Sequence, residues 1–85
     1  MPFEVGIKDP VTEVLKKMDR PTAEAIVNQI EKLKEHPREY GKPLGGRLHP
    51  LWQLRSGHYR IWYTIDGEYV YVRAVYHKDE ARKLY

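Results

Sequence analysis

The chain contains no cysteine in its 85 residues. This absence excludes a disulfide framework, a thiolate nucleophile and a cysteine-based zinc site. The chain also has no apolar run long enough to cross a membrane, and its N-terminus lacks a basic-then-apolar signal pattern. We therefore expect a soluble, cytoplasmic protein that does not engage a membrane.

Several kinds of catalytic centre are absent as well. The acidic residues lie mainly on expected helices and turns and form no credible carboxylate pair. Ser56 precedes Gly57 in turn-forming sequence rather than in a nucleophile elbow, and Gly45-Gly46 does not follow a strand as a phosphate loop does. The four histidines show no metal-ligand spacing. We therefore expect neither a metal nor a cofactor.

What the chain does contain suits one small domain, residues 1–85, because 41% of its residues are hydrophobic. Residues 1–41 hold seven Lys/Arg and eight Asp/Glu, whereas residues 42–85 hold eight and four, so the second half carries +4. Basic charge interleaved with Trp and Tyr suits a surface for single-stranded nucleic acid, since cations meet phosphates while rings stack on bases. A solvated basic surface explains the charge equally well.

The first half of the chain predicts a strand and two helices. Apolar and polar residues alternate over residues 2–8, as in a half-buried strand. Asp9-Pro10 and Asp19-Arg20-Pro21 are helix-start signals, with Asp as the N-cap. The first helix is expected to stop near Asp19, and the second to run to His36, before Pro37. Together they predict an antiparallel helical hairpin with its apolar side toward a sheet.

The second half predicts an irregular segment followed by strands. Residues 37–50 hold three prolines and three glycines, which predicts an irregular surface segment suited to a binding loop. Apolar runs flank Ser56-Gly57 within residues 51–63 and predict a β-hairpin, and Asp66-Gly67 predicts a second tight turn. Residues 68–76 read as a further strand, and the charged residues 77–85 as one or two helical turns.

Alternation assigns the side chains of these strands to two faces. Tyr59, Ile61, Tyr63 and Ile65 share one face, whereas Arg60, Trp62 and Thr64 share the other. In the following strand the two sides are expected to hold Val70, Val72, Ala74 and Tyr76, and Tyr69, Tyr71, Arg73 and Val75. An arginine within an apolar strand must keep its guanidinium in water or against an anion. Arg60 is therefore the first candidate site residue.

The order of these elements predicts an α+β fold. An N-terminal strand and an antiparallel helical hairpin precede a three-stranded antiparallel meander, which completes a four-stranded sheet, and a short C-terminal helix follows. Tight turns between strands imply an antiparallel sheet with the helices on one face. The other face is expected to be open, with Arg60 and Trp62 pointing to it.

A site made of cations, histidine and tyrosine suits the cleavage of RNA, whose own 2′-OH is the nucleophile. The protein must deprotonate that hydroxyl, stabilise negative charge on the phosphorane and help the 5′-oxygen leave. Arginine forks hold phosphate oxygens and stay charged, while histidine or tyrosine moves protons. DNA lacks the hydroxyl, so this chemistry is specific for RNA.

The run Leu54-Arg55-x-Gly57-x-Tyr59-Arg60, the apolar strand after it and the segment His77-Lys78…Tyr85 resemble the RelE/ParE toxin superfamily. These are the small toxins of bacterial and archaeal toxin–antitoxin pairs. The resemblance follows the element order over nearly the whole chain, and Leu44-Gly45-Gly46 matches a stretch that often precedes the central hairpin. It implies a RelE-like fold, a cognate antitoxin in a toxin–antitoxin hetero-oligomer and, for RelE-type members, metal-free cleavage of mRNA in the ribosomal decoding site.

The resemblance also implies residue roles. Arg60 corresponds to the arginine that contacts the scissile phosphate, and Arg55 binds phosphate or braces the hairpin. His77 and Lys78 match a C-terminal basic pair, and Tyr85 matches a terminal tyrosine that stacks on a base or transfers a proton. Three further arginines are expected to hold ribosomal or messenger phosphates: Arg47, Arg73 and Arg82.

Departures from the family pattern keep other functions open. Leu51 and Gln53 stand where active members carry lysines, and the spacing from His77 to Tyr85 is longer than usual. Such departures also suit a ParE-like inhibitor of DNA gyrase that cleaves nothing, or an attenuated relative that binds its antitoxin without activity. The retained Arg60 and the basic C-terminal segment favour the nuclease. For Arg60 itself the alternative role is a surface ion pair, with Asp66 or Glu68 on a neighbouring strand.

Overall fold

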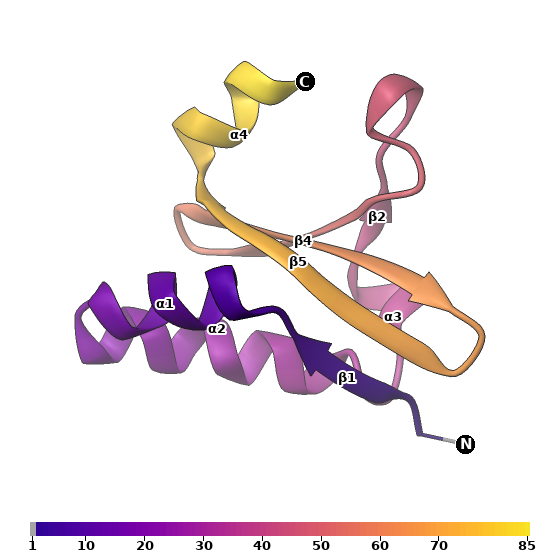
Figure 1. Cartoon of the computed structure of the whole chain (residues 1–85), viewed down its shortest axis with the longest axis horizontal. Helices are drawn as coiled ribbons and strands as arrows, with labels where there is room; N and C mark the ends of the chain where they lie inside the picture. Colours follow the sequence, from indigo (N-terminus) through magenta and orange to yellow (C-terminus); the bar gives the residue numbers. More distant parts are fainter. Residues whose placement is uncertain (1) are drawn as a thin grey trace.

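The computed structural model describes residues 2–85. In chain order its elements are β1 (Glu4–Ile7), α1 (Asp9–Lys17), α2 (Arg20–Lys32), α3 (Pro37–Tyr40), β2 (Lys42–Pro43), the 3-10 turn η1 (Gly46–Leu48), β3 (Trp52–Ser56), β4 (Tyr59–Asp66), β5 (Tyr69–His77) and α4 (Lys78–Leu84). The strands form one sheet in the order β1-β5-β4-β3-β2. Helices α1 and α2 cover one face of this sheet, and α4 lies on the opposite side (Figure 1).

The predicted α+β architecture is confirmed, with two corrections to the sheet. Lys42 and Pro43 of β2 pair antiparallel with Gln53 and Trp52, so the sheet has five strands rather than four. This fifth strand lies in the segment for which proline and glycine predicted no regular structure. β1 runs parallel to β5, because the two helices carry the chain back before the meander begins. The sheet is therefore mixed rather than antiparallel throughout.

The two predicted helices form, with small shifts at their ends. Asp9, predicted as the N-cap of the first helix, is instead its first helical residue, and Lys8 occupies the N-cap position. Asp19 is the N-cap of α2 as expected: its carboxylate accepts hydrogen bonds from the Thr22 hydroxyl at 2.8 Å and the Thr22 N–H at 3.2 Å. These bonds hold the pKa of Asp19 below its ordinary value, and the bond from the Thr22 hydroxyl contributes most. α2 ends at Lys32 rather than His36. The chain tightens there, with the Leu33 N–H donating to the carbonyl three residues back at 2.9 Å.

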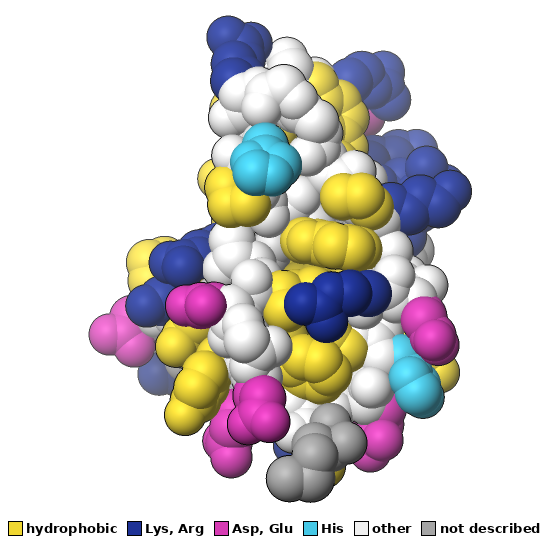
Figure 2. Space-filling view, turned by 90° about the vertical axis from the view of Figure 1, so that its right-hand side faces the viewer, with side chains coloured by type: hydrophobic (Ala, Val, Ile, Leu, Met, Phe, Trp, Pro, Cys, Tyr) yellow, Lys and Arg dark blue, Asp and Glu magenta, His cyan; other side chains and the backbone are white. Residues whose placement is uncertain are grey.

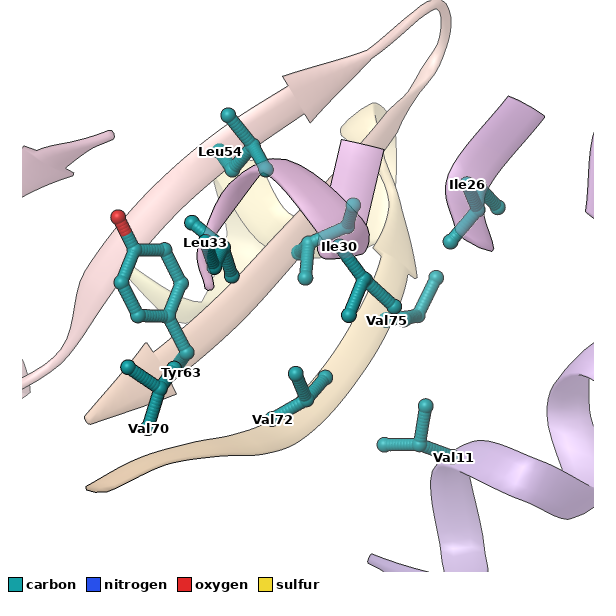
Figure 3. Packing of buried hydrophobic residues seen from close by; sticks show 10 residues of the cluster. Val11, Ile26, Ile30, Leu33, Leu54, Tyr63, Val70, Val72 and Val75 are labelled. Atoms are coloured by element: carbon teal, nitrogen blue, oxygen red, sulfur yellow. The ribbon is translucent and has the colours of Figure 1, made fainter. Parts of the chain in front are cut away.

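The apolar core lies between the sheet and helices α1 and α2 (Figure 3). The apolar side of α2 supplies Ile26 and Ile30, and its C-cap residue supplies Leu33, whereas Val27 is 38% exposed. The predicted inward face of β4 is confirmed by Ile61 and Tyr63, both fully buried. The cluster comprises Val11, Ile26, Ile30, Leu33, Leu54, Ile61, Tyr63, Val70, Val72 and Val75.

β5 breaks the predicted alternation at Arg73. Tyr63 pairs with Val72 and Trp62 pairs with Ala74, so Arg73 stands opposite no residue of β4. This is a β-bulge, in which two residues of one strand oppose one of the other. Every later residue of β5 consequently changes face.

The bulge corrects the predicted faces of β5. Val75 joins the core at 7% exposure, although alternation placed it outside. Ala74 and Tyr76 lie on the opposite face, where the Tyr76 ring meets the Trp62 indole edge-on with centroids 5.1 Å apart. Period-two alternation cannot reveal a bulge, because the extra residue only shifts the phase of the pattern.

Both predicted tight turns form, each one residue further along the chain. Ser56 pairs with Tyr59, and Asp66 with Tyr69, so glycine is the first of two loop residues in each turn. Gly57 and Gly67 both have φ of +59°, which a residue with a side chain rarely adopts and which a type II′ hairpin turn requires. Among the helices of residues 2–85, none has the length and apolar character to span a membrane.

Candidate functional site

The sheet face opposite α1 and α2, here called the outer face, carries the candidate site. Arg55 of β3 and Arg60 of β4 are cross-strand partners on this face. Because Ser56 and Tyr59 close the turn by hydrogen bonds, the Arg55–Arg60 pair is of the non-hydrogen-bonded kind, in which side chains approach most closely. Like charges in this position repel. Within residues 2–85 neither arginine forms an ion pair with an acid.

The side chain of Arg60 is anchored at the hairpin end. Its Nη1 donates to the carbonyl oxygens of Gly57 and Tyr59, each at 3.0 Å. Asp66 begins the turn at the other end of β4, six residues away and hence about 20 Å along the strand. Arg60 therefore does not form the alternative ion pair with Asp66 or Glu68. The Nε and Nη2 groups of Arg60 have no acceptor within residues 2–85.

Helix α4 covers part of the outer face, which is less open than predicted. The ring of Tyr85 stacks on the Trp62 indole, with centroids 6.2 Å apart and planes at 25°. Its hydroxyl hydrogen-bonds to Oε1 of Gln53, and its backbone oxygen accepts from Nη2 of Arg47 at 3.2 Å. Trp62 beneath the helix is 4% exposed, and Ala81, on the buried side of α4 itself, is 1% exposed. The end of α4 is thus tied to β3, β4 and η1.

Gln53 is the residue whose part the sequence did not reveal. Its Oε1 also accepts a hydrogen bond from Nε1 of Trp62 at 2.9 Å. An indole N–H only donates, so this contact determines which amide atom of Gln53 faces Trp62 and turns Nε2 elsewhere. The sequence showed Gln53 only as a residue in place of a lysine. The clue available was alternation, which places Gln53 on the same face as Arg55.

His77 does not join the arginines. It lies two residues beyond Val75 on the face toward α1, where its ring meets Tyr59 edge-on at 5.5 Å. Its Nδ1 accepts from the Asp79 N–H at 3.3 Å, and the Glu80 carboxylate accepts from the His77 N–H at 3.4 Å. This capping box starts α4. In this arrangement His77 caps the helix.

The remaining predicted residues lie around the rim of the outer face. Lys78 begins α4, and its N–H donates to the His58 carbonyl at 2.6 Å. Arg82 is exposed, 3.5 Å from the Asp79 carboxylate. The structure thus brings Arg55, Arg60 and Tyr85 to one face. Arg47 of η1 contacts the backbone of Tyr85 at the end of α4.

Arg73 lies on the outer face but away from the other arginines. Its Nε donates to the Thr64 hydroxyl at 3.0 Å, and its guanidinium lies 5.4 Å from the centre of the Tyr71 ring. Thr64 is four residues from Arg60 on β4, about 13 Å along the strand. Arg73 therefore does not join the Arg55–Arg60 pair.

Charge is separated across the molecule. Figure 2 shows Lys and Arg side chains dominating the upper part of the view, where α4 and η1 lie, whereas Asp and Glu gather in the lower half. This matches the excess of basic residues after residue 41. The upper end of this view thus presents a positive field to an approaching anion.

One tyrosine is set apart from the site by burial. Tyr63 is fully buried, and its hydroxyl donates to the Pro37 carbonyl at 2.6 Å. Burial raises the pKa of Tyr63 to about 12. Tyr63 therefore keeps its hydroxyl proton, which it uses in the hydrogen bond to Pro37 and not in proton transfer. Within residues 2–85 no three His, Cys, Asp or Glu side chains are grouped to hold a metal ion.

Comparison with solved structures places the fold. The RelBE2 toxin–antitoxin complex of Mycobacterium tuberculosis contains a chain 29% identical to this one, with a TM-score of 0.84 over 91% of this chain and 99% of that one. A mutant Escherichia coli RelE in the free state is 21% identical, with a TM-score of 0.77 over 96% and 90%. The archaeal RelE–RelB complex of Pyrococcus horikoshii contains a chain that is 20% identical, with a TM-score of 0.75 over 92% of this chain and 97% of that one.

Comparison by sequence gives the family. The chain matches no curated protein sequence. Residues 5–82 match the model of the ParE toxin of the type II toxin–antitoxin system, parDE. That match spans both helices, the whole meander and most of α4, and it confirms the relationship predicted from the hairpin motif. This protein belongs to the ParE toxin family of type II toxin–antitoxin systems, within the RelE/ParE superfamily.

Proposed function

We propose that this toxin is a ribosome-dependent endoribonuclease that cleaves mRNA by attack of the RNA's own 2′-OH. The observation that carries the proposal is the Arg55–Arg60 pair on the outer face. Two guanidinium groups directly opposite each other, without an acidic partner, repel unless an anion binds between or above them. Phosphate suits this arrangement because each guanidinium holds its oxygens with parallel N–H donors.

In the proposed reaction Arg60 stabilises the charge that develops on the phosphorane. Its anchoring by two carbonyl groups fixes the guanidinium before the substrate arrives, so little reorganisation is needed in the transition state. Arg55 holds a second oxygen of the same phosphate. Tyr85 and Lys78 supply groups that exchange protons with the 2′-OH and the 5′-oxygen. His77 has its Nδ1 engaged at the helix cap and contributes by starting α4.

We also propose that the protein acts in the cytoplasm and is neutralised by a cognate antitoxin in a hetero-oligomer. The M. tuberculosis relative was solved in a toxin–antitoxin complex. On this chain the outer face offers apolar rings beside basic groups. Tyr85 is 52% exposed and Leu84 42% exposed at the end of α4. Such a surface suits an amphipathic acidic segment.

The alternative is a ParE-like inhibitor of DNA gyrase that has no catalytic activity, or an attenuated toxin that only binds its antitoxin. Two observations support this alternative. The matching family model is that of ParE, and Gln53 uses its oxygen to hold Trp62 and Tyr85, so it provides no cationic acid. The nuclease remains our conclusion because Arg60 is anchored and without an ion-pair partner.

The test is toeprinting of mRNA on ribosomes with a cognate codon in the decoding site, comparing the wild type with Arg60→Ala. We expect new cleavage by the wild type and a rate at least about tenfold lower for the variant, equivalent to about 1.4 kcal/mol. Arg20→Ala is the matched control, since it removes an arginine of α2 whose side chain is 89% exposed and pairs with Glu24. Absence of cleavage by folded wild-type protein would overturn the proposal. Inhibition of gyrase supercoiling would then identify the ParE-like alternative.

A further inference from the structure

A pocket of about 310 Å³ lies along the free edge of β3, bordered by α2, α3 and β2, and Arg55 of the Arg55–Arg60 pair lines it. At about 30 Å³ for each water, it has room for an oxyanion with several water molecules. No acidic side chain lines it. Its lining residues are Gln29, Tyr40, Lys42, Gln53, Leu54 and Arg55, and we refer to it as the edge pocket.

The backbone at the edge pocket presents an unpaired donor. β2 pairs only with Trp52 and Gln53, so β3 has no neighbouring strand on that side from Leu54 onward. In the non-hydrogen-bonded Arg55–Arg60 pair, the N–H and C=O of Arg55 point away from β4 and toward this free edge. The Arg55 N–H is therefore available to a ligand in the pocket.

The side chains add three donors. Lys42 is the cross-strand partner of Gln53, so both belong to the outer face together with Arg55. Lys42 forms no ion pair within residues 2–85. Gln53 commits Oε1 to Trp62 and Tyr85, which leaves Nε2 as its only free polar atom. The three residues that carry an ammonium, a guanidinium and an amide donor are all among those that line the edge pocket, together with Gln29 of α2 and the buried Leu54. Such a donor set matches a phosphate group.

We propose that the edge pocket binds a backbone phosphate of the RNA, next to the phosphate held at Arg60. This inference rests on the proposed function and adds Lys42 and Gln53 to the RNA-binding surface. Arg55 lies between the two positions. Lys42 is two strands away from β4, roughly 9.5 Å at the usual spacing of strands. A single strand of RNA laid across β4, β3 and β2 meets Arg60, Arg55 and Lys42 in turn.

An acidic side chain from a protein partner is the competing occupant of such a donor set. RNA is favoured because the donors continue without interruption from Arg60, where the proposed chemistry requires a phosphate. A polymer with one charge on every unit matches a row of donors better than an isolated carboxylate does. The experiment below separates the two.

The experiment measures binding of a short single-stranded 2′-O-methyl RNA, which has no nucleophilic hydroxyl, to the whole chain over a range of salt concentrations. Lys42→Gln should weaken binding about tenfold at low salt. It should also reduce the slope of log K against log salt by about 0.7, the value for one lost phosphate contact on a single strand. Lys16→Gln is the matched control, because it removes the same charge from a side chain of α1 that is 68% exposed and lies beside Glu13. It should leave the slope unchanged.

Gln53→Glu is a second, independent variant. It retains an oxygen for Trp62 and Tyr85 but replaces the free amide donor with a carboxylate oxygen, so RNA binding should weaken at least as much as in Lys42→Gln. An unchanged NMR shift of the Trp62 indole N–H would show that the contact with β4 persists.

The edge-pocket proposal is overturned if Lys42→Gln binds RNA with the affinity and slope of Lys16→Gln, or if the wild type binds no RNA. It is equally overturned if Lys42→Gln weakens binding of the cognate antitoxin and leaves RNA binding intact. mRNA cleavage on ribosomes, measured in parallel, reports on the proposed function separately. If the wild type cleaves mRNA but Lys42→Gln does not change RNA binding, the proposed nuclease function stands and the edge-pocket proposal is rejected.

Discussion

The ring of Tyr85 stacks on the indole of Trp62, with centroids 6.2 Å apart, and this contact joins the end of α4 to the middle of β4. Short helices are marginal by themselves, and α4 has seven residues. Its docking therefore depends on the contacts of its end as much as on its own hydrogen bonds. The state of this contact decides how much of the outer face a ligand can reach.

Tyr85→Ala should release the last turn of α4. The variant loses both the stacking on Trp62 and the hydrogen bond to Gln53, so we expect faster amide exchange at Arg82 and Leu84 and a shifted Trp62 indole N–H signal. Tyr85→Phe keeps the ring and should retain a docked helix. Identical spectra for Tyr85→Ala and the wild type would show that the helix is held by other contacts.

Arg60→Lys should lose most of the cleavage that Arg60→Ala loses. A lysine ammonium is a point charge on a flexible stem and cannot contact two carbonyl groups while presenting parallel donors to phosphate. We expect a rate at least about tenfold below the wild type, or about 1.4 kcal/mol, in single-turnover cleavage on programmed ribosomes. Full activity in Arg60→Lys would mean that charge alone matters and that the anchored fork does not.

Gly41→Ala should destabilise the fold through Tyr63. A methyl group on Gly41 would overlap the Tyr63 hydroxyl and lie 3.0 Å from the Gln53 carbonyl oxygen. Tyr63 is fully buried and has no room to move, so overpacking should cost about 1 to 3 kcal/mol or more in denaturant unfolding. Gly45→Ala is the control: its methyl meets nothing within 4 Å, and its φ of −100° suits any residue. Equal stability of the two variants would contradict the close approach of Gly41 to the Tyr63 hydroxyl.

The stability of the wild type should fall between pH 10 and pH 12 relative to Tyr63→Phe. The folded-state pKa of Tyr63, about 12, lies above the ordinary value of about 10, because burial disfavours the phenolate. A raised pKa contributes stability that is complete below pH 10 and is lost as pH rises toward 12. At about 1.4 kcal/mol for each pH unit, the loss is of the order of 2 kcal/mol. Unfolding curves for both proteins that shift in parallel over this range would refute it.

Local patterns predicted most of the elements, because they depend on neighbours in the chain. Asp19 before Arg20-Pro21 specifies a helix start through its own hydrogen bonds with Thr22. Alternation in β4 assigned Ile61 to the core and Arg60 to the outer face. The hairpin motif around Gly57 further identified the superfamily. Each of these predictions needs only a few consecutive residues.

Predictions that need a partner strand were wrong or absent. The bulge at Arg73 reversed the faces of Ala74 and Val75, because the register between β4 and β5 places the extra residue. β2 formed in a proline- and glycine-rich segment, because the free edge of β3 offers it hydrogen-bonding partners. In both cases the deciding hydrogen bonds join residues far apart in sequence.

The same distinction between local and long-range contacts applies to the candidate site. The sequence by itself determined that Arg60 shares a face with Trp62 and Thr64, since alternation along β4 settles it. The register of the turn, one residue further along than predicted, is what placed Arg55 opposite Arg60. Only the tertiary structure decided that Gln53 holds Trp62 and Tyr85, and that His77 turns to the opposite face as a helix cap. Those contacts depend on where α4 lands on the sheet, and that is determined by the packing of its buried side against β4 rather than by any pattern within α4.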